Sequence, residues 1–115
     1  MTTVYNDDIL FFDGINVLDL ALSNQTPFYL YSEKIITNNF LAYQKSFKDN
    51  PHLICYSVKA NSNLSILSLL AKLGSGFDIV SGGELSRVIQ AGGDPSKIVF
   101  SGAVSYTHLR AHETH

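Results

Sequence analysis

The sequence has a single cysteine, Cys55, and this scarcity excludes an internal disulfide framework. Cys55 lies in an apolar run, where a small reduced thiol packs well. Small secreted domains usually depend on disulfides, so the lone cysteine favours a cytosolic compartment, that is, a cytoplasmic location.

The sequence also lacks long apolar runs and a large excess of charge. No stretch approaches the length that crosses a bilayer, and no basic segment leads into an apolar run near the start. We therefore expect a chain that is neither exported nor membrane-bound. The net charge is −2, with acidic and basic residues interspersed, which gives no electrostatic footprint for nucleic acid or an anionic membrane. The length of 115 residues is sufficient for one small globular domain.

What is present is a repeat of apolar strands and amphipathic helices. Strands are predicted over residues 28–31, 53–58, 77–81 and 98–100, and one helix separates each pair. Each helix has apolar residues on one face: Ile36, Phe40, Tyr43 and Phe47; Ile66, Leu69, Leu70 and Leu73; Leu85, Val88 and Ile89. The repeat indicates an α/β fold with a parallel sheet covered by helices. Periodicity alone leaves open whether the sheet is doubly wound or part of a closed barrel.

The first residues show a different pattern. Two short apolar runs, residues 9–12 and 15–17, flank Asp13-Gly14, a pair that accepts the positive φ of a tight hairpin. A short helix is predicted over residues 18–22. These residues therefore predict a β-rich segment ahead of the strand–helix repeat.

The most informative stretch is residues 55–63, where an apolar run ends in one lysine and then in small polar residues. Side chains alternate between the two faces of a strand, so we expect Cys55, Ser57 and Lys59 to share one face. This face is small until Lys59, which leaves room for a ligand at the carboxyl end of the strand, where α/β folds bind ligands. Partial burial there would favour a neutral, nucleophilic amine. The alternative is a lysine that extends into solvent.

Two motifs carry a family resemblance. Tyr56-Ser57-Val58-Lys59-Ala60-Asn61, followed by residues 76–85 (GFDIVSGGEL), resembles the diaminopimelate decarboxylase family, pyridoxal-phosphate enzymes of the fold group of ornithine decarboxylase and alanine racemase. The resemblance runs from about the N-terminus to Ala103. It implies a partial (β/α)8 TIM barrel of the alanine racemase-like type, about the first four β/α units, because a whole barrel needs roughly 250 residues. We therefore expect a fragment, in which residues 1–26 contribute to a second, β-rich domain and residues 27–103 form half of a pyridoxal-phosphate-binding barrel.

The resemblance also implies a function. It implies decarboxylation of meso-2,6-diaminopimelate to lysine, with pyridoxal 5'-phosphate as the cofactor and a homodimer as the full-length assembly. The fragment itself is expected to be inactive. Two alternatives stay open: another decarboxylase of the family, acting on arginine, ornithine or carboxynorspermidine, and a non-catalytic pyridoxal-phosphate-binding barrel protein.

The resemblance assigns catalytic roles to Lys59 and Asp78. Lys59 would bind pyridoxal phosphate covalently and be displaced by the amino group of the substrate. Asp78, between two apolar residues of a predicted strand, would lie near the cofactor lysine. Its carboxylate either pairs with Lys59 or orders polar groups around the cofactor, or it is a structural group satisfied by backbone amides.

Other polar residues of the motifs have simpler explanations. Gly82 and Gly83 are expected to form a tight turn close to the cofactor, since the family's main phosphate cradle lies further along the chain. Glu84 in the first helical turn is favoured by the helix dipole, and a secondary active-site role stays open. Asn63 is expected to cap the following helix, whereas Asn61 either caps it or orders the turn after Lys59.

Residues 104–115 change composition abruptly and contain three of the four histidines. His108, His112 and His115 have a spacing that would align zinc ligands on a helix. Their His-Glu-Thr-His order, however, is not the His-Glu-x-x-His pattern of zinc proteases. The run resembles the translation of a sequencing adapter, so we interpret it as a non-native tail and expect no metal site.

Overall fold

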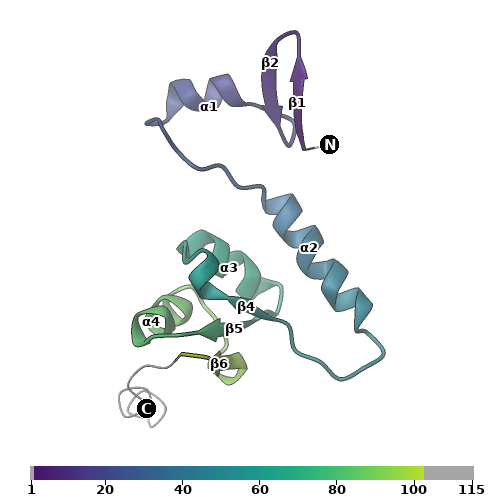
Figure 1. Ribbon diagram of the computed structural model, residues 1–115, viewed down its shortest axis with the longest axis vertical. Helices are drawn as coiled ribbons and strands as arrows, with labels where there is room; N and C mark the ends of the chain where they lie inside the picture. Colours follow the sequence, from purple (N-terminus) through teal and green to yellow (C-terminus); the bar gives the residue numbers. More distant parts are fainter. Residues whose placement is uncertain (1, 103–115) are drawn as a thin grey trace. The chain divides into compact units, whose positions relative to one another are not determined.

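The structure is a computed structural model that describes residues 2–102, and the tail at residues 104–115 lies outside the described residues. The chain divides into two compact units, Met1–Ser32 and Glu33–His115 (Figure 1). Among the helices of the described part, none combines the length and apolar composition that a bilayer crossing requires.

The first unit is a small antiparallel sheet followed by one helix. Strands β1 (Thr3–Asn6), β2 (Ile9–Phe12) and β3 (Ile15–Asn16) pair in that order, and helix α1 spans Val17–Ser23. The expected hairpin at Asp13-Gly14 is confirmed, with positive φ at both turn residues. Strand β3 ends one residue earlier than predicted because Asn16 is the N-cap of α1, where its side chain accepts a hydrogen bond from Asp19 N at 3.2 Å.

The strand predicted over residues 28–31 is wrong. No helix or strand includes these residues, and the Tyr29 side chain is 88% exposed. An apolar run forms a strand only where a neighbouring strand takes up its backbone hydrogen bonds, and within residues 2–102 none does so for this segment. Ser32 ends the unit, and its hydroxyl donates a hydrogen bond to Asp13 Oδ2 at 2.7 Å.

The second unit contains the strand–helix repeat. Helix α2 (Glu33–Ser46) is followed by β4 (Cys55–Ser57), the 3-10 turn η1 (Val58–Ala60), α3 (Leu64–Lys72), β5 (Gly76–Ile79), α4 (Gly82–Gln90), the 3-10 turn η2 (Pro95–Lys97) and β6 (Ile98–Phe100). Strands β4, β5 and β6 form a parallel sheet in that order. The predicted α/β organisation with a parallel sheet is therefore confirmed for these three strands.

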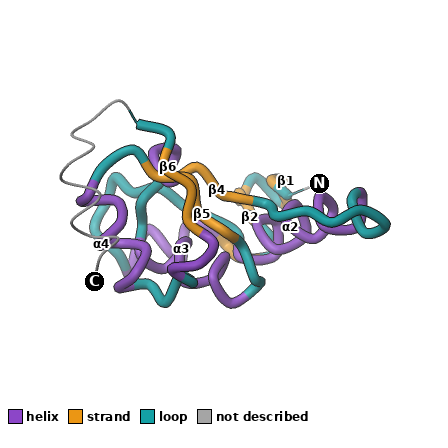
Figure 2. The backbone as a smooth tube through the Cα atoms, turned by 90° about the horizontal axis from the view of Figure 1, so that it is seen from below, coloured by secondary structure: helices purple, strands orange, loops and turns teal. Residues whose placement is uncertain are grey.

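One face of the parallel sheet is covered by helices. The register places Tyr56 beside Phe77 and Phe77 beside Ile98, so these large side chains share a face. They belong to or pack against one core cluster, made of Phe40, Val58, Ile66, Leu67, Leu70, Phe77, Ile79 and Val88. Figure 2 shows helices α3 and α4 beside the strands of this sheet. The core thus fixes the positions of β4 and β5 through α2, α3 and α4.

The other face of the sheet carries small or polar side chains. Ser57, Asp78 and Val99 are neighbours in the register and point away from the helix-covered face. Cys55 and Gly76 are paired on the same face, and a Cβ atom on Gly76 would lie only 2.7 Å from Cys55 Sγ. This face therefore has little side-chain bulk of its own.

Candidate functional site

Lys59 lies at the carboxyl end of the parallel sheet, but not on a strand. Strand β4 ends at Ser57, and Lys59 is the middle residue of η1. The prediction that Cys55, Ser57 and Lys59 share one strand face is therefore wrong for the lysine, since side chains alternate only while the backbone stays extended. The predicted partial burial is also absent, because the Lys59 side chain is exposed in this chain.

The turn that carries Lys59 is anchored on both sides. Val58 is fully buried in the core cluster, so the residue next to the exposed lysine has a fixed place. On the other side, Asn61 N donates to Val58 O at 3.1 Å and closes the turn. The Tyr56 hydroxyl donates to Asn61 O at 2.9 Å. Lys59 thus extends from a short segment whose backbone is held by neighbouring groups.

The segment after Lys59, residues 60–63, is called the elbow. Asn61 Oδ1 accepts a hydrogen bond from Asn63 N at 3.0 Å, and Asn63 Oδ1 accepts one from Ser65 N at 2.9 Å. The predicted cap of α3 by Asn63 is confirmed. Asn61 orders the elbow, which settles the choice between its two expected roles.

A further contact to the elbow comes from helix α4. The Arg87 guanidinium donates from Nε to Ser62 O at 2.9 Å. No sequence pattern predicts this contact, because the two residues are 25 positions apart and Arg87 resembles an ordinary surface residue of an amphipathic helix.

Asp78 lies on β5 beside Ser57, on the sheet face that carries small side chains. Its Oδ1 atom is buried and has no hydrogen-bond partner within the described residues. This oxygen therefore pairs neither with Lys59 nor with a backbone amide, the two partners considered from the sequence. A buried carboxylate oxygen without a partner is costly, and a ligand that brings a hydrogen-bond donor would satisfy it.

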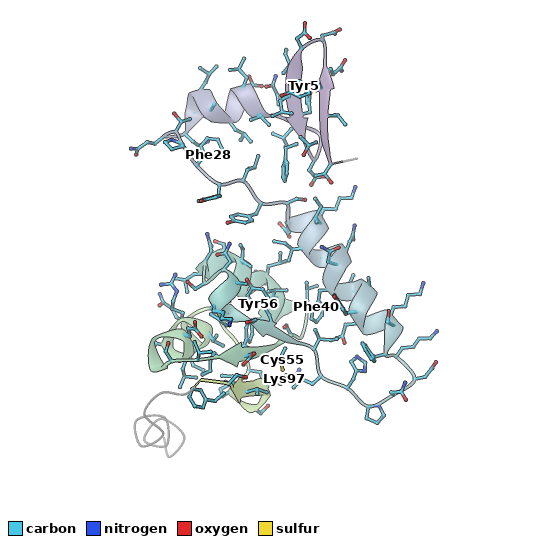
Figure 3. All side chains as sticks on the ribbon, in the orientation of Figure 1. Tyr5, Phe28, Phe40, Cys55, Tyr56 and Lys97 are labelled. Atoms are coloured by element: carbon cyan, nitrogen blue, oxygen red, sulfur yellow. The ribbon has the colours of Figure 1, made fainter. Side chains whose placement is uncertain are left out.

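Cys55 is close enough to Asp78 for the two groups to interact electrostatically. Burial raises the pKa of the Cys55 thiol, and the negative charge of Asp78 raises it further. Figure 3 shows Cys55 and Lys97 near one another, as expected because both approach Gly76. The cysteine is therefore held as a neutral thiol on the same face as the aspartate.

The turn between β5 and α4 is held by Ser81 and Glu84. Ser81 Oγ accepts a hydrogen bond from Glu84 N at 3.1 Å, and Glu84 Oε1 accepts one from Val80 N at 2.7 Å. Glu84 thereby fixes the turn that follows Asp78, a role that neither of its two expected explanations included. The Gly82-Gly83 pair forms the first turn of α4 directly after this cap.

The segment after β6 runs close to the same turn. Ser101 N donates to Ile79 O at 2.9 Å, which continues the parallel hydrogen bonding past the end of β6. A Cβ atom on Gly102 would lie 2.5 Å from Val80 O, so only glycine fits there without a shift. Residues that follow all three strands therefore gather at the carboxyl end of the sheet, where parallel α/β folds bind ligands.

A family model matches residues 33–113 of this chain, and its description is pyridoxal-dependent decarboxylase, pyridoxal binding domain. The matched range includes Lys59, Asp78 and the whole parallel sheet. It also continues beyond Ala103, where the resemblance was expected to stop.

The curated relatives of this chain include enzymes named diaminopimelate decarboxylase. The diaminopimelate decarboxylase of Vibrio cholerae is 57% identical over 96 residues, which is 84% of this chain and 23% of the relative. The diaminopimelate decarboxylase of Helicobacter pylori J99 is 58% identical over 87 residues, or 76% of this chain and 22% of the relative. The chain thus spans about a quarter of the length of the curated relatives it matches.

Solved structures of similar fold also include diaminopimelate decarboxylases. A diaminopimelate decarboxylase from M. jannaschii is 38% identical with a TM-score of 0.86, over 93% of this chain and 26% of that chain. A Helicobacter pylori diaminopimelate decarboxylase in complex with L-lysine is 49% identical with a TM-score of 0.81, over 86% of this chain and 25% of that chain.

Proposed function

The chain belongs to the pyridoxal-dependent decarboxylase family, within its pyridoxal-binding domain, and on that premise we propose that it supplies the cofactor lysine of a diaminopimelate decarboxylase. The reaction would remove the α-carboxylate of meso-2,6-diaminopimelate as carbon dioxide and yield lysine. The observation that carries this proposal is Lys59, which lies on a turn held by hydrogen bonds at the carboxyl end of the sheet. The neighbouring strand carries Asp78, whose buried Oδ1 atom has no hydrogen-bond partner within the described residues.

The identity levels favour diaminopimelate over the other substrates of the family. Relatives that are 49–58% identical have the name diaminopimelate decarboxylase, whereas a lysine decarboxylase structure from Selenomonas ruminantium is 33% identical. Because substrate choice depends on side chains around the reacting centre, the nearer relatives are the better guide to the substrate.

We also propose that β4, β5 and β6 are consecutive strands of a (β/α)8 barrel. Support comes from their parallel pairing in sequence order, from the helices that join them on one face, and from the similarity in fold to the M. jannaschii enzyme. In such a barrel the face of Ser57, Asp78 and Val99 would point inward. The homodimer and the cytosolic location implied by the sequence stay predictions.

The exposure of Lys59 supports its proposed role as the amine that binds the cofactor. Its Nζ is at the end of a flexible side chain on an exposed turn, so an aldehyde group can approach it. The backbone of that turn is fixed by Val58 and by the Tyr56 hydroxyl bond, which limits the region that the amine can reach. In the proposed role, Lys59 holds the cofactor covalently and later accepts or returns a proton at Nζ.

Asp78 would provide a fixed negative charge on the same side of the sheet. Its unpartnered Oδ1 can accept a hydrogen bond from a ligand without first losing a protein partner. Bound pyridoxal phosphate supplies an electron sink for the pair left at the substrate's α carbon when carbon dioxide departs. The protein residues described here would position that chemistry and hold its charges.

The test uses a hybrid enzyme, because the chain spans about a quarter of its relatives. In the hybrid, residues 2–102 replace the matching segment of the Vibrio cholerae enzyme. Borohydride reduction in the presence of pyridoxal phosphate should attach the cofactor to Lys59, as located by peptide mass spectrometry. Lys59→Ala should abolish both the label and the decarboxylation of diaminopimelate, whereas Lys72→Ala, at an exposed lysine of α3, should leave both unchanged. Labelling of another lysine in the parent hybrid would refute the proposed role.

A further inference from the structure

We infer that Arg87 is a positioning residue for Lys59, acting through the carbonyl of Ser62. This inference rests on the proposed function of Lys59. Arg87 contacts neither the lysine side chain nor Asp78 in the described hydrogen bonds, so its effect would pass through the backbone of the elbow. One hydrogen bond between helix α4 and the elbow would thereby influence where the amine lies.

The hydrogen bond has the properties of a specific contact. The Nε–O distance of 2.9 Å lies at the optimum for an N–H donor, and the donor is charged, which makes it stronger than a neutral one. Ser62 lies outside helix and strand, so its carbonyl has no place in a regular hydrogen-bond ladder. Arg87 therefore supplies this carbonyl with a protein partner.

The helix that carries Arg87 has a fixed position. Val88, the next residue, is fully buried in the core cluster. The start of α4 is held by the Ser81 cap and by the bond from Val80 N to Glu84 Oε1. Arg87 is thus carried by a helix whose position is fixed by the core and by its N-terminal hydrogen bonds.

The same helix is therefore connected to both candidate catalytic residues. Glu84, three residues before Arg87, holds the turn that immediately follows the strand of Asp78. Arg87 holds the elbow that immediately follows Lys59. Because both bonds involve side chains of one short helix, α4 contributes, together with the pairing of β4 and β5, to the separation between the amine and the carboxylate. Loss of the Arg87 bond would free the lysine side of this arrangement and leave the aspartate side in place.

The first test measures amide hydrogen exchange in the 115-residue chain. Arg87→Met removes the donor and keeps an unbranched side chain, Arg87→Lys keeps a charged donor, and Gln90→Met is a matched control on an exposed position of the same helix. In Arg87→Met, exchange at the elbow amides Asn61 and Asn63 should be roughly threefold to tenfold faster, the factor expected for one net hydrogen bond. Core amides of α3 and β5 should keep their parent rates, Gln90→Met should match the parent, and Arg87→Lys should lie between Met and parent.

Two outcomes of that test would overturn the inference. Unchanged elbow exchange in Arg87→Met would show that the bond does not hold the elbow. Equal acceleration of elbow and core amides would assign Arg87 to general stability instead of positioning. The Arg87→Lys variant provides a further check, because elbow exchange as fast as in Arg87→Met would attribute the effect to packing of the guanidinium.

The second test measures how fast Lys59 of the hybrid enzyme becomes attached to pyridoxal phosphate, with borohydride used to stop the reaction at set times. Attachment in Arg87→Met should be about threefold to tenfold slower than in the parent, in proportion to its elbow exchange. Attachment at the parent rate would overturn the positioning role while the proposed function stands. If the parent hybrid never labels Lys59, the proposed function fails, and the inference about Arg87 fails with it.

Discussion

The hydroxyl of Tyr56 donates a hydrogen bond to the carbonyl of Asn61 at 2.9 Å, so the strand before Lys59 is tied to the elbow after it. The ring of Tyr56 packs against the core cluster, which makes this bond a direct connection between the interior and the elbow. The four residues between Tyr56 and Asn61, residues 57–60, are thereby held in a closed loop that includes Val58 and Lys59.

Removal of the Tyr56 hydroxyl should lower the stability of the folded chain without disturbing the packing of the core. In Tyr56→Phe the ring still fills its place, but Asn61 O loses its donor, so we expect a loss of about 1 kcal/mol in the free energy of unfolding. Tyr43→Phe is the matched control, since Tyr43 is 62% exposed on α2, and its effect should stay within about 0.5 kcal/mol. Urea denaturation of the two variants measures the difference. Equal effects would mean that the hydroxyl bond of Tyr56 contributes nothing specific.

The charge of Asp78 should contribute to the raised pKa of Cys55, after the larger effect of burial. The pKa of the thiol is raised by burial first and by the Asp78 charge second. Asp78→Asn removes the repulsion of the thiolate, so the pKa of Cys55 should fall towards its ordinary value while the burial effect remains. The rate of alkylation by iodoacetamide, measured against pH, should therefore rise at a lower pH in Asp78→Asn than in the parent.

Asp49→Asn is the control for that titration, because Asp49 is an exposed residue and no contact between it and Cys55 is found in the described chain. Its alkylation profile should superimpose on that of the parent. A similar shift in both variants would point to a change in net charge as the cause and contradict a local effect of Asp78.

Gly76 should not tolerate a methyl group. A Cβ atom there would lie 2.7 Å from Cys55 Sγ and 2.7 Å from Lys97 O, so Gly76→Ala should destabilise the chain by about 1–3 kcal/mol. Gly83→Ala has a nearest contact of 3.8 Å on helix α4 and should be neutral or stabilising by up to about 1 kcal/mol. Thermal unfolding compares the two. The double variant Gly76→Ala with Cys55→Ala should recover only part of the loss, since the Lys97 carbonyl remains.

Replacement of asparagine by alanine should lower the stability at a helix cap but not inside a helix. Asn63→Ala removes the cap of α3 and should cost about 1 kcal/mol, whereas Asn63→Asp keeps an acceptor for Ser65 N and should stay near the parent. Asn39→Ala, at an exposed position within α2, should be neutral or slightly stabilising because alanine has the higher helix propensity. Helicity and stability can be followed by circular dichroism. If Asn39→Ala lowered the stability as much as Asn63→Ala, the effect at Asn63 could not be attributed to capping.

Sequence patterns predicted those elements whose structure is determined by residues close together in the sequence. Phe77 and Ile79 are apolar and Asp78 is polar, so alternation along a strand places the carboxylate opposite the core, and the structure has it there. The hairpin at Asp13-Gly14 and the cap by Asn63 were likewise predicted from local chemistry alone.

The errors arose where distant residues decide the local structure. Residues 28–31 have strand-like composition, but within the described chain no neighbouring strand takes up their backbone groups. Strand β1 was not expected because all four of its residues are exposed, so no apolar alternation marks it. Lys59 was assigned to a strand face because Val58 is apolar, yet Val58 reaches the core from a 3-10 turn. Arg87 gave no signal because its partner is a backbone carbonyl, which the sequence does not identify.

Val58 and Lys59 are adjacent, yet the first is fully enclosed and the second faces solvent. A change in side-chain volume beneath the turn, such as Val58→Ala or Val58→Ile, would displace the backbone that carries the lysine. Substitutions at a buried residue that no substrate contacts can thus change the region that the exposed Lys59 amine can reach. Interior variation at this single position therefore offers a route to altered reactivity that leaves every exposed group unchanged.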